Sequence, residues 1–265
     1  MRDLGLCCVC ASAKIEGKDI NTNVRAIMPG LVLFGNLGRD RGGHASESGS
    51  HGQQTRQAIL AQALKIAARE GLAALTIGRL AKELGMSKSG LFAHFHSKQA
   101  LELATVEKAG EVFADAVLRP AQAGREGIER LWNLCDLWLV HVERRVFPGA
   151  YFFTGAFFEY VDRPGPIAGA ISRVAREWFN TLKKAVQEAQ QQREIDPDAE
   201  AKQVAWELNG RLVGAYWAHL VEGGDCCREA RAALLGRLRE LATDEIPASA
   251  FKSVGAWKKY LRGRH

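Results

Sequence analysis

The amino-acid sequence predicts an all-α protein, and three observations support this fold class. From Thr55 to about residue 242, apolar residues recur at i, i+3, i+4 and i+7, the spacing of one face of a helix. No segment there alternates apolar and polar residues with the period of two that a half-buried strand shows. Ser and Thr stand where helices would begin, and Gly or Pro stand where they would end.

Composition sets the scale of the fold. The chain has 265 residues, of which 47% are hydrophobic and 25% are charged. These values are typical of globular proteins, and the length allows one large or two modest domains.

The first 53 residues do not follow the helical pattern. The stretch 35–54 is rich in Gly, Ser, His and Arg, and it cannot bury enough apolar surface to offset the entropy of ordering. We therefore expect residues 1–53 to be a disordered extension or the product of a mis-assigned start codon, with the native chain beginning at Met28 or later. A secretory signal is a third interpretation of the apolar run from Leu4 to Ala13, although Gly5 interrupts that run.

Two helices are expected next, each with its own boundary residues. The first covers about 55–70, has one broad apolar face and stops at Gly71. Thr76 is a good N-cap for the second, which is short and ends at Gly85, a residue that accepts the left-handed conformation of a C-cap.

Two more helices follow directly. Ser87 is the expected N-cap of a third helix, which directs Leu91 and Phe95 inward at i and i+4. Ser97 is the expected N-cap of a fourth, which runs from Lys98 to about Leu118. Four helices thus fit into about 65 residues.

The remainder of the chain is expected to form longer helices separated by Pro and Gly. Their predicted ranges are about 124–145, 164–193, 198–222 and 226–242. We expect these helices to belong to a second domain over 102–243, followed by a loosely attached basic tail over 244–265.

Positive charge is concentrated in one segment. The net charge is +6. Residues 55–98 contain seven Lys or Arg and two Glu, which gives +5 and accounts for nearly all of the excess. A local basic excess points to a polyanionic partner more strongly than a diffuse one does.

The same segment has the spacing of a helix-turn-helix. Ala81, Gly85 and Leu91 place a small residue where two helices meet, a residue that tolerates positive φ in the turn, and an apolar anchor in the second helix. Together with the local charge, this spacing predicts a DNA-binding domain over 54–101 whose second helix enters the major groove. The alternative is a small helical subdomain with a solvated basic face.

Residues 76–98, TIGRLAKELGMSKSGLFAHFHSK, also resemble the DNA-binding signature of the tetracycline-repressor (TetR/AcrR) family of bacterial transcription regulators. The resemblance covers about 55–101. It implies a three-helix DNA reader, a larger helical domain for effector binding and dimerisation, a palindromic operator bound by a homodimer, and release when a small molecule binds. The repressor role is implied by the resemblance alone.

Seven residues are candidate DNA contacts: Thr76, Arg79, Lys88, Ser89, Phe92, His94 and Lys98. Lys88 begins the third helix, where it would contact a guanine edge or a phosphate. Thr76 and Lys98 resemble the phosphate-binding residues of the family, and His94 would also contact a phosphate. Phe92 replaces the family's usual Tyr and lacks its hydroxyl, so Arg79 is a candidate to compensate.

Aromatic residues of the second domain suggest an apolar effector pocket or simply its core. The candidate pocket residues are Trp138, His141, Phe153, Phe157, Glu159 and Trp178. In the family the last two long helices form the dimer, and both carry apolar stripes here: Ala205, Leu208, Leu212, Ala215 and Trp217 on one, and Ala230, Leu234, Leu238 and Leu241 on the other. Packing inside a monomer would use the same stripes.

Other function classes have less support. No nucleotide-binding loop or hydrolase motif occurs, so we expect no enzyme, no cofactor, no metal site and no membrane partner. The six cysteines suit a reducing cytoplasm, yet Cys7-Cys8-Val9-Cys10 and Cys226-Cys227 leave a thiol- or metal-responsive regulator as an alternative. A sequence-nonspecific architectural DNA binder is the other alternative.

Overall fold

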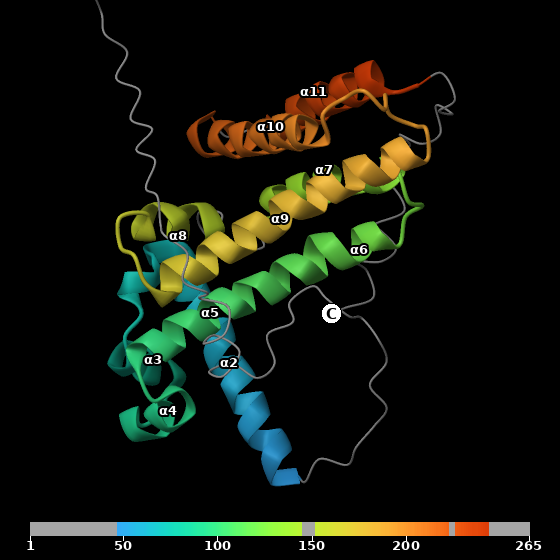
Figure 1. Ribbon diagram of the computed structural model, residues 1–265. Helices are drawn as coiled ribbons and strands as arrows, with labels where there is room; N and C mark the ends of the chain where they lie inside the picture. The colour runs from blue at the N-terminus through green and yellow to red at the C-terminus, as the bar shows by residue number, and fades with distance from the viewer. Residues whose placement is uncertain (1–46, 145–151, 223–225, 244–265) are drawn as a thin grey trace, which may run out of the picture. The chain divides into compact units, whose positions relative to one another are not determined.

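The computed structural model describes residues 47–144, 152–222 and 226–243 (Figure 1). Within these ranges the secondary structure is helical, apart from an isolated antiparallel bridge between Ile195 and Ala242. The all-α prediction is confirmed. The predictions for residues 1–46 and for the tail 244–265 lie outside the described residues.

The first helix, α2 (Glu47–Glu70), starts earlier than predicted. The segment 47–53, assigned to a disordered extension, is its first part, so that boundary was wrong. Once Ile59, Leu60 and the apolar residues that follow are packed, each further residue adds a backbone hydrogen bond without a new nucleation cost. Helix propagation from the packed residues therefore extends α2 into the segment 47–53, although that segment is polar and contains Gly.

The short helices α3 (Ile77–Leu84) and α4 (Lys88–Phe95) have the predicted caps. Thr76 Oγ1 accepts from the Arg79 N–H at 3.2 Å, and Ser87 Oγ accepts from the Gly90 N–H at 3.0 Å. A 3₁₀ turn, η1 (Leu72–Ala74), connects α2 to α3.

The next helical segment continues past Leu118, its predicted end, to Gln122. α5 (Lys98–Phe113) continues through a π-helical turn, η2 (Ala114–Leu118), into α6 (Arg119–Gln122). The N–H of Arg119 donates to the carbonyl of Ala114, five residues back. Pro120 then stands in the first turn of α6, where its missing N–H is tolerated.

The second domain contains α7 (Ile128–Glu143), α9 (Pro166–Gln191), α10 (Ala201–Glu222) and α11 (Cys226–Leu241), each close to its predicted range. An additional helix, α8 (Phe152–Tyr160), was not predicted. Its sequence is apolar around most of its circumference and therefore lacks the one-sided pattern of a surface helix.

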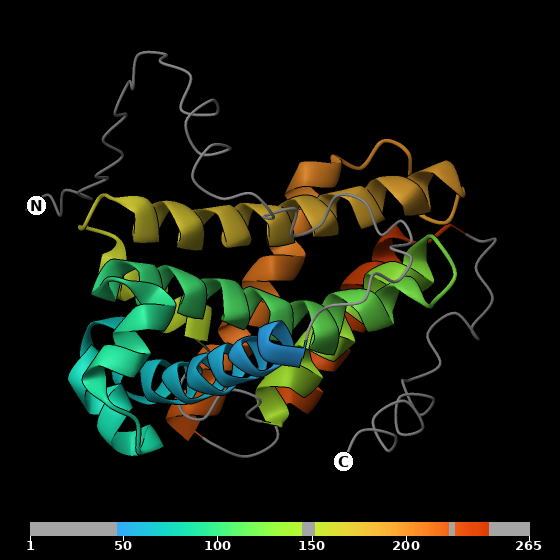
Figure 2. The ribbon, with the colours of Figure 1, turned by 90° about the horizontal axis from the view of Figure 1, so that it is seen from below.

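Helices α5, α7 and α9 pack together, and α10 lies between α9 and α11 (Figures 1 and 2). α8 contacts both α9 and α2, so it links the two halves of the fold. The apolar stripes of the last two helices are buried within this one chain, except for Trp217, which is 48% exposed. None of the described helices combines the length and apolarity needed to cross a membrane.

Candidate DNA-binding surface and effector pocket

The turn between α3 and α4 has helix-turn-helix geometry. Gly85 is left-handed, with φ of 63°, and the N–H of Met86 donates to the carbonyl of Ala81 at 2.9 Å. Ala81 is 2% exposed and Leu91 is fully buried. The three residues that predicted the motif therefore have the expected positions, and the turn fixes α4 against α3.

The N-terminal half of α4 exposes several side chains to solvent. Lys88, Ser89 and Phe92 are all exposed, and Phe92 retains 49% of its accessible surface. A Cβ on Gly78 of α3 would lie 3.2 Å from Lys88 Cε, so this glycine leaves room for the stem of the lysine. His94 is half-buried, and its carbonyl accepts from Arg56 Nη1 at 3.0 Å. Arg56, which sequence reasoning missed as a positioning residue, ties α2 to α4.

Arg79 is held at the surface of the domain by ion pairs with two neighbouring carboxylates. Its guanidinium donates to both Glu70 carboxylate oxygens, at 2.6 and 2.7 Å, and to Glu83 Oε1 at 3.1 Å. The hydrogen bonds from Arg79 lower the pKa of Glu70. To replace the hydroxyl missing at Phe92, Arg79 would have to leave both carboxylates.

Thr76 lies on the connection between α2 and α3, and Lys98, the first residue of α5, contacts the same connection. Lys98 Nζ donates to the carbonyl of Ala73 at 2.9 Å and lies 3.5 Å from Glu102 Oε1. Thr76 is exposed and begins α3. A cation and a helix N-terminus thus flank one short segment, an arrangement that suits a phosphate.

Glu159 belongs to this junction and does not line the pocket. Its carboxylate accepts from the N–H groups of Leu72 and Ala73 at 2.7 and 2.6 Å. Gly71, with φ of 89°, makes this approach possible, because a Cβ there would lie 2.8 Å from Glu159 Oε2. The interpretation of Glu159 as a ligand-orienting group therefore has no geometric support. Its carboxylate instead fastens α8 to the DNA-binding half.

The next residue strengthens the junction. Tyr160 Oη donates to Glu102 Oε1 at 3.3 Å. Burial raises the pKa of the Glu102 carboxyl, and burial together with the nearby Glu102 charge raises the pKa of Tyr160 to about 12. The two residues at the end of α8 thus contact η1 and α5, the two elements that Lys98 also contacts.

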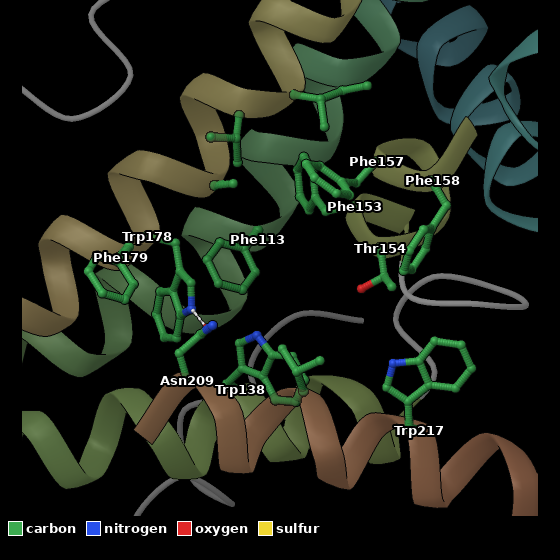
Figure 3. Close-up of a pocket in the computed structure, with 14 residues that line it drawn as sticks. Phe113, Trp138, Phe153, Thr154, Phe157, Phe158, Trp178, Phe179, Asn209 and Trp217 are labelled. Atoms are coloured by element: carbon green, nitrogen blue, oxygen red, sulfur yellow. Dashed lines mark hydrogen bonds between the residues drawn. The ribbon is translucent and has the colours of Figure 1, made fainter. Parts of the chain in front are cut away.

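A cavity of about 330 Å³ lies among α5, α7, α8, α9 and α10 (Figure 3). Four predicted residues line it, namely Trp138, Phe153, Phe157 and Trp178. Eight of its lining side chains are aromatic: Phe113, Trp138, Phe153, Phe157, Phe158, Trp178, Phe179 and Trp217. The volume is within the range of small-molecule sites, near its lower end.

The polar groups at the cavity wall are few. Thr154 and Asn209 line it, and Trp178 Nε1 donates to Asn209 Oδ1 at 3.0 Å (Figure 3). None of the described lining residues carries a charge. The cavity therefore suits an apolar molecule with a small number of polar atoms.

Comparison with known proteins agrees with this geometry. Residues 59–105 match the family described as bacterial regulatory proteins, tetR family. Residues 127–234 match the tetracyclin repressor-like C-terminal domain. Together these matches span more than half of the chain and contain both the helix-turn-helix and most of the cavity wall. The chain belongs to the TetR family of bacterial transcription regulators.

Solved structures share this fold. A TetR regulator from Chloroflexus aurantiacus is 24% identical with a TM-score of 0.67, covering 73% of this chain and 98% of its own. A putative regulator from Saccharomonospora viridis in complex with choline is 21% identical with a TM-score of 0.60, at 72% and 99% coverage. AibR, solved with isovaleryl coenzyme A and operator DNA, is 20% identical with a TM-score of 0.55, at 69% and 96% coverage. No curated protein matches the chain significantly in sequence.

His141, the remaining candidate pocket residue in this TetR chain, lies one layer behind the cavity wall. Its ring meets Phe113 edge-on with centroids 5.7 Å apart, and it is 3% exposed. Burial lowers the pKa of His141 to about 4, so the imidazole is neutral near pH 7. It supports Phe113 without lining the pocket.

Phe158, which belongs to the aromatic run that the sequence associated with a pocket, also lines the cavity. Four further lining side chains were not predicted for the pocket: Phe113, Phe179, Asn209 and Trp217. Phe179 follows the predicted Trp178 directly, and this adjacency is the one signal that the sequence contains for it. Phe113 and Asn209 come from helices whose contribution depends on the packing of the whole domain. Trp217 was assigned to a dimerisation stripe, whereas it lies at the cavity, with its ring centroid 6.3 Å from that of Phe158.

The thiols of the described TetR domains are poorly placed for sensing. Cys135 and Cys227 are buried, and burial raises the pKa of Cys135 to about 12, which keeps it protonated. Among the described residues no group of three His, Cys, Asp or Glu side chains has metal-site geometry. Cys7, Cys8, Cys10 and the Cys226 side chain lie outside this description.

Proposed function

We propose that this protein is a cytoplasmic repressor that binds a palindromic operator as a homodimer and is released by a small-molecule effector, with no catalytic role. The observation that carries the proposal is the N-terminal half of α4, where Lys88, Ser89 and Phe92 are exposed on a helix whose opposite side is anchored by the buried Leu91 and Phe95. A rigid helix with an exposed N-terminal turn is the element that reads a major groove.

Each candidate contact has a distinct role in the proposal. Lys88 and Ser89 would approach base edges, and Phe92 would contact sugar or a thymine methyl. Thr76, His94 and Lys98 would bind phosphates on either side and fix the register. Arg79 would add a phosphate contact only if operator binding breaks its ion pairs with Glu70 and Glu83.

The dimer surface in this proposal differs from the predicted stripes, because those stripes are buried in the single chain. α10 instead exposes Trp206, which is 63% accessible, and Val221, which is 78% accessible. Between them Gly210 and Gly214 are exposed, and a Cβ at either position would meet no neighbouring atom within 4 Å. Large apolar residues separated by small ones allow a second helix to approach closely, which favours a twofold contact between copies of this helix.

Release would pass through α8. This helix supplies Phe153, Thr154, Phe157 and Phe158 to the cavity wall, and its last turn holds η1 through Glu159. A molecule that enters the cavity and moves α8 would also move the connection that carries Thr76 and contacts Lys98. Differential affinity for the two positions of α8 would supply the coupling free energy.

Selection of bound sites from a random DNA library tests the proposal, with the full chain at two salt concentrations. A palindrome with half-sites about one helical turn apart would support the paired helix-turn-helix. Strongly salt-dependent binding without a consensus sequence would favour the architectural alternative. Sedimentation of the complex on a single consensus site would then count the protein copies.

A further inference from the structure

The cavity also limits the chemistry of what it binds. We infer that the effector is an electrically neutral, compact aromatic or alicyclic molecule with a hydrogen-bond acceptor, such as a carbonyl oxygen, placed against Asn209. This inference rests on the proposed effector role of the cavity and adds the ligand class. Four features support it. The described wall residues carry no charge, and the imidazole of His141 behind the wall is neutral. The orientation of the Asn209 amide is fixed, and the aromatic rings of the inner wall pack edge to face.

The uncharged wall disfavours anions and cations alike. An ion that leaves water needs a counter-charge or several hydrogen bonds, and the described lining residues offer no charged side chain. His141, behind Phe113, does not supply a positive charge, because burial holds its pKa at about 4. A carboxylate or phosphate inside this cavity would therefore have no cationic partner among the described wall residues.

The amide of Asn209 has a defined orientation. An indole N–H is only a donor, so the atom that meets Trp178 Nε1 at 3.0 Å must be Asn209 Oδ1. The remaining hydrogens of the amide are then the Nδ2 donors. They select an acceptor on the ligand, and Thr154, whose hydroxyl faces the cavity in Figure 3, adds a second polar group on the α8 side.

The aromatic rings of the inner wall are arranged to hold a neutral molecule. Phe113 meets Trp178 at 87° with centroids 5.4 Å apart, and it meets Phe153 at 79° with centroids 6.3 Å apart. In edge-to-face pairs the electron-rich face of one ring is already satisfied by the edge of another. Fewer open faces remain for a cation, whose attraction to aromatic rings depends on direct access to those faces.

The entrance and the size of the cavity restrict the ligand further. Phe113 is 2% exposed, whereas Phe158 and Trp217 are 60% and 48% exposed and meet at 72°. The cavity thus has a buried inner wall and an aromatic rim at the surface, through which an apolar molecule can enter. A volume of about 330 Å³ suits a bicyclic molecule better than a long chain or a coenzyme conjugate.

The test uses three 2-substituted naphthalenes with the full chain at pH 7.5: 2-acetonaphthone, 2-naphthoate and trimethyl(2-naphthyl)ammonium. Titration calorimetry should show binding of the ketone, with the carboxylate and the ammonium each at least about tenfold weaker. Equal or tighter binding of either ion would overturn the inference. Failure of the ketone to bind while the other two also fail would overturn it as well.

A second comparison assigns the acceptor contact. Asn209→Ala should weaken the binding of 2-acetonaphthone by about 3- to 10-fold. The affinity for 2-ethylnaphthalene, which lacks the carbonyl, should stay nearly unchanged. Asn180→Ala, at an exposed position of α9 away from the cavity, is the matched control and should change neither probe. Equal losses for both probes, or no loss for the ketone, would remove Asn209 from the recognition of the acceptor and contradict the inference.

These binding measurements need no DNA, so they separate two failures. If the ketone binds as expected but leaves operator occupancy unchanged, the ligand class stands and the proposed release by an effector fails. If the protein binds the operator specifically but rejects the ketone in favour of an ion, the DNA-binding proposal stands and the ligand class fails.

Discussion

The helix-turn-helix and the cavity are built by opposite strategies. The candidate DNA contacts are mostly exposed side chains at the beginnings of short helices, where caps only three residues away hold the backbone. The inner cavity wall is buried and brings together residues from five helices. Changes at the first site should alter function and spare stability, whereas changes at the inner wall should alter both.

The largest effect should follow Trp138→Ala. Trp138 is 3% exposed and lines the cavity, so its removal should lower the free energy of unfolding by about 3–5 kcal/mol, as large-to-small core substitutions do. Urea denaturation of the full chain measures this change. Phe158→Ala, at the 60% exposed rim, is the control and should cost less than about 1 kcal/mol. Similar losses for both variants would show that the inner wall is no better packed than the rim.

His141→Gln should change the pH dependence of stability. The pKa of His141 is about 4 in the folded chain against an ordinary 6.5, so below pH 6.5 the unfolded chain binds a proton that the folded chain refuses. The free energy of unfolding therefore falls as the pH drops from 6.5 to 4, by up to roughly 3 kcal/mol from this group. Carboxyls with raised pKa, such as Asp136 and Glu102, act in the opposite direction in both proteins.

Denaturation curves at several pH values isolate the histidine as the difference between wild type and variant. That difference should change steadily between pH 6.5 and 4 and stay constant above this range. Parallel pH profiles would mean that His141 titrates normally in the folded chain.

The contrast between the two sites also decides what sequence could predict. Thr76, Ser87, Ser97 and Gly85 act on neighbours within a few residues, so the spacing along the chain already contains their geometry. The DNA-binding half therefore followed from local rules. The ion pairs of this half were harder to predict from the sequence, because Arg79 reaches Glu70 across the turn between two helices.

The cavity depended on information that spacing does not contain. Asn209 becomes a wall residue because α10 packs on α9 and brings it to Trp178. Glu159 looked like a pocket residue because it follows the aromatic run, yet the helical turn of α8 directs it to η1. In an all-round apolar helix, sequence indicates burial but not which side meets which neighbour.

Lys88→Ala should test the exposed site. We expect operator binding to weaken by about 1–3 kcal/mol if Lys88 reads a guanine, with relaxed specificity at one base. The free energy of unfolding should change by no more than about 0.5 kcal/mol, because the side chain is exposed. Lys184→Ala, on α9 and 77% exposed, is the matched control. A uniform loss on all sequences, with a salt slope reduced by about 1, would assign Lys88 to a phosphate.

Glu159→Gln probes the connection between the two sites. An amide has one acceptor oxygen and no charge, so it replaces two charge-assisted hydrogen bonds with one weaker bond. We expect a loss of about 1–2 kcal/mol in stability and faster hydrogen exchange at the Leu72 and Ala73 amides. Glu126→Gln, at a 60% exposed surface ion pair, should leave those amides unchanged. Unaltered exchange in Glu159→Gln would show that α8 does not hold η1.

Thr76→Ala should lower the free energy of unfolding by about 1 kcal/mol through the lost N-cap, and Thr76→Ser should restore it. The informative quantity is operator affinity measured where both variants are fully folded. If Thr76 also binds a phosphate, alanine weakens operator binding and serine, which keeps the hydroxyl, restores it. If alanine leaves the affinity unchanged, Thr76 acts only as an N-cap. The phosphate contact at this end of the DNA-binding half is then assigned to Lys98, which already contacts the adjoining segment through Ala73.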